Sequence, residues 1–333
     1  MAPKSLPEAL CRQAWEAVAT AGTIADAARA MGVSRQTLEH RYHEGRRRFG
    51  WDDVLRSAFS AKAYDPEQPP QSMLATTMDL VDATVVAFSD AHWTTLEQPR
   101  SLAHEALLRA LPDIKPTMLL SLGDLLDFGD PSRHPPTMWQ PRIKVKDELN
   151  AARRHLADLR ERAPNASRHW VRGNHDDRFD KFLAANAGSF EGVDGFSLAD
   201  HFPDWPMSWR LNLPGMMAVH RYHGGMHAAW NNTVKAGLHV LSGDTHSLEV
   251  KPYRDETGRR YGIQTGMLGD PVWPCFSYTL GITRLWSPGW AVLTWRGGRL
   301  MPPELCEVAE GVAWFRGQAL AGKLRYRVKA LAA

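Results

Sequence analysis

The stretch Arg168–Phe179, RHWVRGNHDDRF, decides the fold of this chain. The short apolar run Trp170-Val171 is typical of a buried strand, and Gly173 follows it where the backbone can turn sharply. The next residues, Asn174-His175-Asp176, are therefore expected at the carboxyl end of a strand, where open α/β sheets bind their ligands. The amide and the imidazole of this turn suit metal ligation and proton donation, but an ordinary polar turn has the same composition.

Apolar, β-branched runs end in polar residues at four other places in the chain. These are the run from Thr84 to Asp90-Ala91-His92, Thr117–Leu122 before Gly123-Asp124-Leu125-Leu126-Asp127, Met216–Val219 before His220-Arg221-Tyr222-His223-Gly224, and Leu238–Ser242 before Gly243-Asp244-Thr245-His246. Helical sequence at Ser101–Leu111 and Lys144–Arg162 alternates with the first strands, which predicts an α/β fold. Asp90 and His92 would share one face of an extended strand. Such oxygen and nitrogen ligands suit a pair of divalent ions.

The order of these motifs resembles the calcineurin-like metallophosphoesterase superfamily, in its branch of DNA repair exonucleases and phage-type phosphoesterases. Asp-x-His, Gly-Asp-x-x-Asp, Gly-Asn-His-Asp, His-Gly and Gly-x-x-His follow one another over residues 80–300 in the order typical of that family. The resemblance implies an α/β metallophosphoesterase sandwich of two mixed β-sheets flanked by helices, with metals at the carboxyl ends of the strands.

The resemblance also implies a site for two divalent metal ions. Matched position by position, Asp90, His92 and His246 would hold the first ion, Asp124 would bridge both, and Asn174 would bind the second. The bridging arrangement would deliver a hydroxide to a phosphorus atom without a covalent enzyme intermediate.

Two ligand positions leave a choice open. His223 precedes Gly224 and matches the family's penultimate histidine, whereas His220 competes because it lies nearer the end of the apolar run. Asp244 stands where the family has a second-metal histidine. A carboxylate is a harder ligand than an imidazole, so we expect a preference for Mn²⁺ or Mg²⁺ over Fe²⁺ or Zn²⁺; otherwise Asp244 binds no metal and the second site is weak.

The resemblance assigns roles to the residues around the metals. His175 would be the general acid that protonates the leaving oxygen, and Asp127 would orient its imidazole. Asp176 would be a structural acid. Arg172 suits either contact with phosphate or stabilisation of the turn.

Residues 1–51 predict a small helix-turn-helix domain. Ile24–Met31 is an Ala-rich helix, Gly32-Val33 a tight turn, and Ser34 an N-cap for the helix that follows. Arg35 and Gln36 at the start of that helix suit base edges in a DNA major groove, and the cluster Arg46, Arg47 and Arg48 suits phosphates. The alternative is a helical docking module with solvated charges.

The remaining segments complete the expected domain organisation. Residues 52–76 contain Pro66, Pro69 and Pro70 and predict a linker, and 77–300 would be the phosphoesterase domain. Residues 301–333 are expected to be a C-terminal helical extension, with Glu307–Ala333 as one basic helix.

Composition narrows the class of protein. The 333 residues are 44% hydrophobic and 23% charged, which is typical of a folded soluble chain. The net charge is only +3, and residues 1–50 hold eight Lys and Arg against five Asp and Glu. Three scattered cysteines favour a reducing compartment, and neither a secretory h-region nor an apolar run of membrane-spanning length is present. We therefore expect a cytoplasmic protein without a membrane partner.

Three functions compete on this basis. The first is a metal-dependent phosphodiesterase or nuclease acting on DNA, which the N-terminal domain would bring to its substrate. The second is a phosphatase or cyclic phosphodiesterase acting on a protein or small molecule. The third is a DNA-binding regulator with an inactive phosphoesterase domain, which the nearly complete ligand set argues against.

Overall fold

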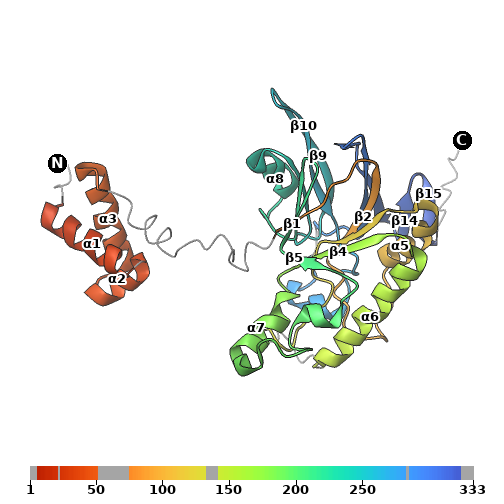
Figure 1. Ribbon diagram of the computed structural model, residues 1–333, viewed down its shortest axis with the longest axis horizontal. Helices are drawn as coiled ribbons and strands as arrows, with labels where there is room; N and C mark the ends of the chain where they lie inside the picture. The colour runs from red at the N-terminus through yellow and green to blue at the C-terminus, as the bar shows by residue number, and fades with distance from the viewer. Residues whose placement is uncertain (1–5, 22, 52–74, 133–141, 283–284, 324–333) are drawn as a thin grey trace, which may run out of the picture. The chain divides into compact units, whose positions relative to one another are not determined.

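The chain divides into two compact units, Met1–Gln71 and Ser72–Ala333. The computed structural model describes residues 6–21, 23–51, 75–132, 142–282 and 285–323 (Figure 1). The expected linker at 52–76 lies outside the described residues except for its last two. These two begin strand β1 (Ala75–Thr77), which pairs in parallel with β6 (Arg210–Leu213), so they belong to a sheet of the second unit.

The described part of the first unit is helical, as the sequence predicts. It contains α1 (Glu8–Ala21), α2 (Ile24–Met31) and α3 (Arg35–Phe49). The Ser34 hydroxyl caps α3 by accepting a hydrogen bond from Thr37 N at 3.1 Å, and Gly32 ends α2 with a φ of 63°. The helices enclose a small core of their own, formed by Ala14, Val18, Ala27, Ala28, Leu38 and Tyr42.

The described strands of the second unit form two sheets. The larger has the order β15-β14-β13-β11-β2-β3-β4-β5, with β12 paired to β11, and the smaller has the order β1-β6-β7-β8-β10-β9. The larger sheet contains β2 (Ala83–Phe88), β3 (Met118–Ser121), β4 (Ser167–Val171), β5 (Met207–Ser208), β11 (Gly289–Arg296), β12 (Arg299–Leu300), β13 (Glu304–Ala309), β14 (Val312–Phe315) and β15 (Gln318–Gly322). The smaller adds β7 (Met216–Val219), β8 (His239–Ser242), β9 (Leu248–Asp255) and β10 (Gly258–Thr265).

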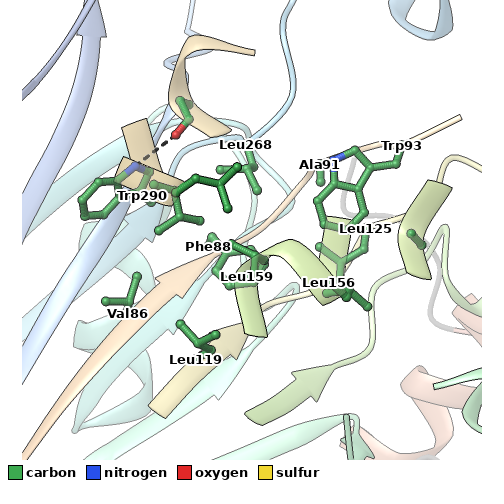
Figure 2. Close-up of a cluster of buried hydrophobic side chains, with 14 of the residues drawn as sticks. Val86, Phe88, Ala91, Trp93, Leu119, Leu125, Leu156, Leu159, Leu268 and Trp290 are labelled. Atoms are coloured by element: carbon green, nitrogen blue, oxygen red, sulfur yellow. Dashed lines mark hydrogen bonds between the residues drawn. The ribbon is translucent and has the colours of Figure 1, made fainter. Parts of the chain in front are cut away.

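Alternate side chains of β2 pack into two different cores, one between the sheets and one beneath the outer helices. Val85 and Ala87 pack into a core with residues of both sheets, including Leu241 and Ile263. On its other face, β2 packs against the outer helices α5 (Leu102–Ile114) and α6 (Val145–Arg162). Figure 2 shows this outer core, with Val86 and Phe88 of β2, Leu156 and Leu159 of α6, and Trp290, whose indole nitrogen donates to the Ala103 carbonyl at 3.2 Å.

The smaller sheet carries α8 (Ala228–Ala236) near β8, β9 and β10, and α7 (Asp177–Asn186) follows β4. Both sheets are mixed, since each contains parallel and antiparallel pairs. The predicted fold class, two mixed β-sheets flanked by helices with a small all-α unit at the N-terminus, is confirmed.

The C-terminal segment is not the helix that we expected. Residues 304–322 form the antiparallel strands β13, β14 and β15, while 324–333 lie outside the described residues. The turns between the strands explain the error. Glu310-Gly311 have φ values of 52° and 76°, and Arg316-Gly317 have 50° and 76°. Two successive positive φ values match the right-handed twist of a tight hairpin, so each glycine marks a turn.

Candidate metal centre

The polar motifs meet because parallel strands end at the same edge. Phe88 is level with Ser121 in the pairing of β2 with β3, and Ser121 is level with Trp170 in the pairing of β3 with β4. In the other sheet, Val219 is level with Ser242 at the ends of β7 and β8. Residues that follow these strand ends are therefore delivered to one region between the sheets.

Backbone conformation at the site is unusual. Asp90, His92, Asp124, Asp244 and His246 all have positive φ, with values of 53°, 45°, 51°, 69° and 57°. Non-glycine residues adopt this conformation at a cost of about 1–3 kcal/mol each, and such residues gather at functional sites. The expected reason for the closeness of Asp90 and His92 is therefore wrong: β2 ends at Phe88, and a left-handed loop, not the face of a strand, brings the two together.

Close approach explains the glycine in the central motif. A Cβ on Gly173 would lie 2.0 Å from Asp124 Oδ1 and 2.5 Å from Asp124 N. Gly123 is equally constrained, because its Cβ would lie 2.5 Å from Gly173 N. The turn after β4 therefore packs directly on the turn after β3, and no side chain fits between them.

The first group of candidate ligands is Asp90, His92 and His246. One ligand atom from each lies within 4.8 Å of the others, and all three residues are buried. His246 Nε2 is 3.3 Å from Asp90 Oδ1. The structure thus brings together the three residues predicted for the first metal.

The second group is Asp90, Asp124 and His220, again with ligand atoms within 4.8 Å. His220 donates from Nδ1 to the Leu122 carbonyl at 2.6 Å, which turns Nε2 toward Asp124 Oδ2 at 3.2 Å. Burial opposes protonation of His220, but Asp124, Asp90 and Asp244 outweigh it and raise the pKa of His220 to about 10. The carboxylates of this cluster therefore attract positive charge.

Buried ligand atoms that make no hydrogen bond among the described residues show that the cluster fits metal ions. Within the described part of the chain, Asp90 Oδ1, His92 Nε2 and His220 Nε2 are buried without a hydrogen bond, although Asp90 Oδ1 faces His246 and His220 Nε2 faces Asp124. Burial lowers the pKa of His92, so its imidazole is neutral, and Nδ1 contacts Asp127 Oδ1 at 3.1 Å. A carboxylate on one nitrogen of a histidine leaves the other nitrogen as a metal ligand. The donor set is suited to divalent cations.

Of the two competing histidines, the structure puts His220 at the cluster, whereas the sequence motif favoured His223. His223 is half-buried, its backbone N–H donates to Asn232 Oδ1 at 2.9 Å, and its ring lies against Tyr222 with centroids 4.7 Å apart. His220 comes directly after β7, where strand ends converge. Proximity to the strand end was the better signal than the adjacent His-Gly pair.

Asp244 and Asn174 lie at the edge of the centre. Asp244 N donates to Asp90 Oδ2 at 3.1 Å, while Asp244 Oδ1 lies 3.7 Å from His220 Nε2 and accepts from Arg221 Nη2 at 2.6 Å. Asp244 is thus within reach of the second group but is tied to an arginine. Asn174 is exposed in the turn between Gly173 and His175.

His175 and Asp127 lie together beside the cluster. His175 donates from Nδ1 to the Asp127 carbonyl at 2.8 Å, and the same nitrogen is 3.3 Å from Asp127 Oδ1. Burial opposes protonation of His175, but Asp124 and Asp127 outweigh it and raise its pKa above the ordinary value. The contacts place Asp127 where it orients both His175 and His92.

Asp176 is the structural acid that the motif implies. It is fully buried and accepts hydrogen bonds from Asp124 N, Leu125 N, Gly173 N and Trp170 Nε1, at 2.9, 3.2, 2.8 and 2.9 Å. One carboxylate therefore fastens two site turns together. Arg172 forms ion pairs with Asp177 and Asp180, which supports its role in the turn and not in phosphate contact.

Sequence reasoning missed three neighbours of the centre. Phe276 and Trp286 pack on His246, with ring centroids 5.6 and 4.1 Å from its imidazole. Arg178 donates from Nη2 to His175 Nε2 at 3.0 Å. The spacing of three residues between His175 and Arg178 at a helix start is the signal that would have found this contact.

The predicted DNA-contacting residues differ in exposure. Arg35 and Gln36 are exposed at the N-terminal end of α3. In the arginine cluster, Arg46 lies over the Tyr42 ring at 5.9 Å, Arg47 pairs with Glu44 at 2.8 Å, and Arg48 donates to the Leu6 carbonyl at 2.6 Å. The cluster is therefore partly occupied by contacts within the unit. None of the helices in the described ranges combines the length and apolar character needed to cross a membrane.

The chain is similar to two phage proteins. The gene 54 protein of Mycobacterium phage L5 is 27% identical over 231 residues, which cover 62% of this chain and 88% of that protein. The gene 54 protein of Mycobacterium phage D29 is 28% identical over 231 residues, with the same coverage of 62% and 88%.

The fold of this chain is also similar to that of solved structures, one of which is a phosphoesterase. Vacuolar Protein Sorting 29 from Cryptosporidium parvum matches with a TM-score of 0.37 and 10% identity, covering 70% of this chain and 95% of that chain. YfcE, a phosphoesterase from E. coli, matches with a TM-score of 0.30 and 16% identity, covering 66% and 97%.

Family comparison agrees with the ligand cluster. The model of the calcineurin-like phosphoesterases matches residues 83–260, which run from the start of β2 into β10 and contain the candidate ligands from Asp90 to His246. This protein therefore belongs to the calcineurin-like phosphoesterase family and is a metallophosphoesterase with an Asp/His metal site.

Proposed function

We propose that this metallophosphoesterase is a phosphodiesterase that cleaves DNA, and that its N-terminal unit holds the DNA. The observation that carries the proposal is the start of α3, where Arg35, Gln36 and Thr37 are exposed side by side. Arginine and glutamine at the N-terminal end of a helix that follows a helix and a tight turn suit base edges in a major groove.

The local structure supports this use of α3. Ser34 caps the helix, while Leu38 and Tyr42 bury the opposite face in the core of the unit. The outer face is therefore presented on a rigid support, and the helix start adds a partial positive charge that favours phosphate. Because Arg46, Arg47 and Arg48 have partners within the unit, we assign base contacts to Arg35 and Gln36 and weaker phosphate contacts to the three arginines.

The residues of the metal centre suit hydrolysis of a phosphodiester. Two divalent ions, held by Asp90, His92, His246, Asp124, His220 and the edge residues Asn174 and Asp244, would neutralise phosphoryl oxygens and lower the pKa of a water. His175 lies next to this group, with Nε2 3.9 Å from Asp124 Oδ2, and we assign it the protonation of the leaving oxygen. Asp127 fixes its ring.

We propose Mn²⁺ as the ion that works best, with Mg²⁺ next. The support is Asp244, a carboxylate at the edge of the second group, since hard oxygen ligands suit these ions better than they suit Zn²⁺. Comparison of Mn²⁺, Mg²⁺, Fe²⁺ and Zn²⁺ on the stripped protein tests this order directly.

The deciding experiment is hydrolysis by metal-stripped full-length protein resupplied with Mn²⁺. Substrates are bis-p-nitrophenyl phosphate, p-nitrophenyl phosphate, and linear single- and double-stranded DNA. His175→Ala and Asp124→Ala test the centre, and the pair Arg35→Ala and Gln36→Ala tests α3. Arg12→Ala on the exposed side of α1 is the matched control for loss of charge in the first unit.

The outcomes separate the competing functions. Cleavage of DNA and of the diester, lost in both centre variants and reduced only on DNA by the α3 variants, supports the proposal. Turnover of the monoester alone overturns it in favour of a phosphatase. Binding of DNA without hydrolysis of any of these substrates points instead to a regulator.

A further inference from the structure

Arg178 lies at the rim of the metal centre and makes two separate contacts there. It is the second residue of α7 and is half-buried. Its Nη1 donates to the Asp127 carbonyl at 2.8 Å, and its Nη2 donates to His175 Nε2 at 3.0 Å. The guanidinium therefore lies against the nitrogen to which the proton-donating role is assigned.

Arg178 and Lys181, both on α7, differ in how their charges are paired. Among the residues that the structure describes, Arg178 forms no ion pair, although Asp177 precedes it directly; that carboxylate pairs instead with Lys181 at 2.5 Å. Nearby Arg172 shows the contrast, because it is paired with both Asp177 and Asp180. A half-buried guanidinium without a carboxylate partner is suited to an anion that comes from outside the chain.

The hydrogen bond from Arg178 to His175 Nε2 cannot persist while the same nitrogen donates a proton to a substrate. A guanidinium only donates, so the hydrogen bond from Arg178 Nη2 requires His175 Nε2 to accept, while His175 Nδ1 faces the Asp127 carbonyl. A histidine that protonates a leaving oxygen needs its proton on Nε2. Two donors cannot face each other, so an acceptor atom must come between Arg178 Nη2 and His175 Nε2 before the proton is transferred.

We propose that Arg178 binds the substrate, with Nη2 leaving His175 for an oxygen of the scissile phosphoester. The Nη1 contact with Asp127 keeps the guanidinium at the rim while Nη2 changes partner. One substrate oxygen then accepts from Arg178 and from His175 together. This inference rests on the proposed phosphoester hydrolysis at this centre and does not depend on DNA being the substrate.

The test uses full-length protein loaded with Mn²⁺ and inorganic phosphate as the probe. Titration calorimetry gives the dissociation constants of phosphate and of Mn²⁺, and hydrolysis of bis-p-nitrophenyl phosphate gives kcat and KM. The variants are Arg178→Met, which keeps an unbranched side chain without the charge, and Arg178→Lys, which keeps the charge but not the paired N–H donors of the guanidinium. Lys181→Met is the matched control, because it removes a positive charge from the same helix without touching His175.

The expected result is a loss in phosphate binding of about tenfold to a hundredfold in Arg178→Met, as for a hydrogen bond to a charged group, with a raised KM for the diester and unchanged affinity for Mn²⁺. Arg178→Lys should lie between this variant and wild type, and Lys181→Met should behave as wild type.

Three results overturn the inference. Unchanged phosphate binding in Arg178→Met, with only kcat reduced, makes Arg178 a positioning residue for His175 and not a substrate ligand. An equal loss of phosphate affinity in Lys181→Met would show that phosphate responds to the overall positive charge of α7 and not to a contact with Arg178. If Arg178→Met fails to fold, Arg178→Lys decides, since wild-type phosphate affinity there also overturns the inference. Failure of wild type to cleave DNA would remove the proposed substrate but would leave the phosphate measurement intact.

Discussion

At the scale of single residues, Asp244 has two possible partners. Its Oδ1 accepts from Arg221 Nη2 at 2.6 Å and lies 3.7 Å from His220 Nε2 in the second ligand group. Arg221 is 63% exposed in its side chain, so the pair is weakly held and can open. A cation in the second group and the guanidinium therefore compete for the same carboxylate oxygen.

We predict that Arg221→Met tightens binding of the more weakly held metal. Removal of the guanidinium frees Asp244 and removes its repulsion of the metal cation. The dissociation constant of that metal should therefore fall about two- to fivefold. Asp244→Asn should weaken it. Calorimetric titration of Mn²⁺ into stripped protein measures both, with Arg254→Met on the exposed part of β9 as the control. Equal affinity in Arg221→Met and wild type would contradict competition.

Individual residues differ in how well the sequence predicts their place. Asp176 could be recognised because its motif carries it, and it does fasten the turns after β3 and β4. His220 could not be separated from His223, because the choice depends on which residue first leaves β7. Gly173 was expected to allow a turn, whereas it is required by the approach of Asp124. Such contacts join turns far apart in the sequence, and local pattern does not contain them.

At the scale of elements, α6 carries an unusual acid toward the site. Glu148 is fully buried, its Oε2 accepts from Phe128 N at 2.5 Å, and its Oε1 has no hydrogen-bond partner among the described residues. Burial and the nearby charge of Asp127 raise the pKa of Glu148 to about 8. The helix therefore holds this carboxyl in its protonated form at neutral pH, in support of the loop that carries Asp127.

We predict that the free energy of unfolding of the stripped protein falls as pH rises from 6 to 9, and falls less in Glu148→Gln. The folded pKa lies above the ordinary value of 4.5, so the folded state binds the proton more tightly and loses that advantage as pH approaches 8. Between pH 6 and 9, the free energy of unfolding should fall by about 2–3 kcal/mol more in wild type than in Glu148→Gln. Urea unfolding at several pH values measures it.

Glu105→Gln is the control for that measurement, since Glu105 lies on α5 with its side chain 42% exposed. Parallel pH profiles for wild type and Glu148→Gln would show that Glu148 is ionised throughout, and would refute the assignment.

The elements around the central motif were predicted well from the sequence, and the last ones were not. Strands β2, β3, β4 and β7 and helix α6 were expected within a few residues of their bounds, because continuous apolar runs and helical periodicity are strong local signals. Strands β13, β14 and β15 are only six, four and five residues long, so each gives a weak local signal. Their hairpin turns at Gly311 and Gly317 were the only local evidence, and it was missed.

At the scale of the whole molecule, two units with separate cores share one chain. The first has its own cluster around Leu38 and Tyr42, and the second has its cores between and outside the two sheets. The connecting residues 52–74 are not among those described. Binding of DNA and hydrolysis of phosphoesters are therefore expected to be separable properties.

We predict that the fragment 72–333 hydrolyses bis-p-nitrophenyl phosphate with kcat and KM within about twofold of the full chain, since the described ligands all lie in the second unit. On DNA the KM of the fragment should rise about tenfold or more, which is an effect typical of linked binding modules. The reason is that the fragment lacks the N-terminal unit, which is proposed to raise the local concentration of DNA. Steady-state kinetics on both substrates measures this. Equal KM on DNA for fragment and full chain would show that the first unit does not deliver the substrate.

The position of β2 in its sheet also bears on how the protein is made. Val86 pairs on one side with Leu119 of β3 and on the other with Val292 of β11. A nascent chain leaving the ribosome has β2, β3 and β4 long before β11, so the middle of the large sheet has an open, hydrophobic edge through most of synthesis. Long-range pairing of this kind is slow, and open edges pair with other chains. Biosynthesis at high rates should therefore favour aggregation unless a chaperone shields the growing sheet until β11 arrives.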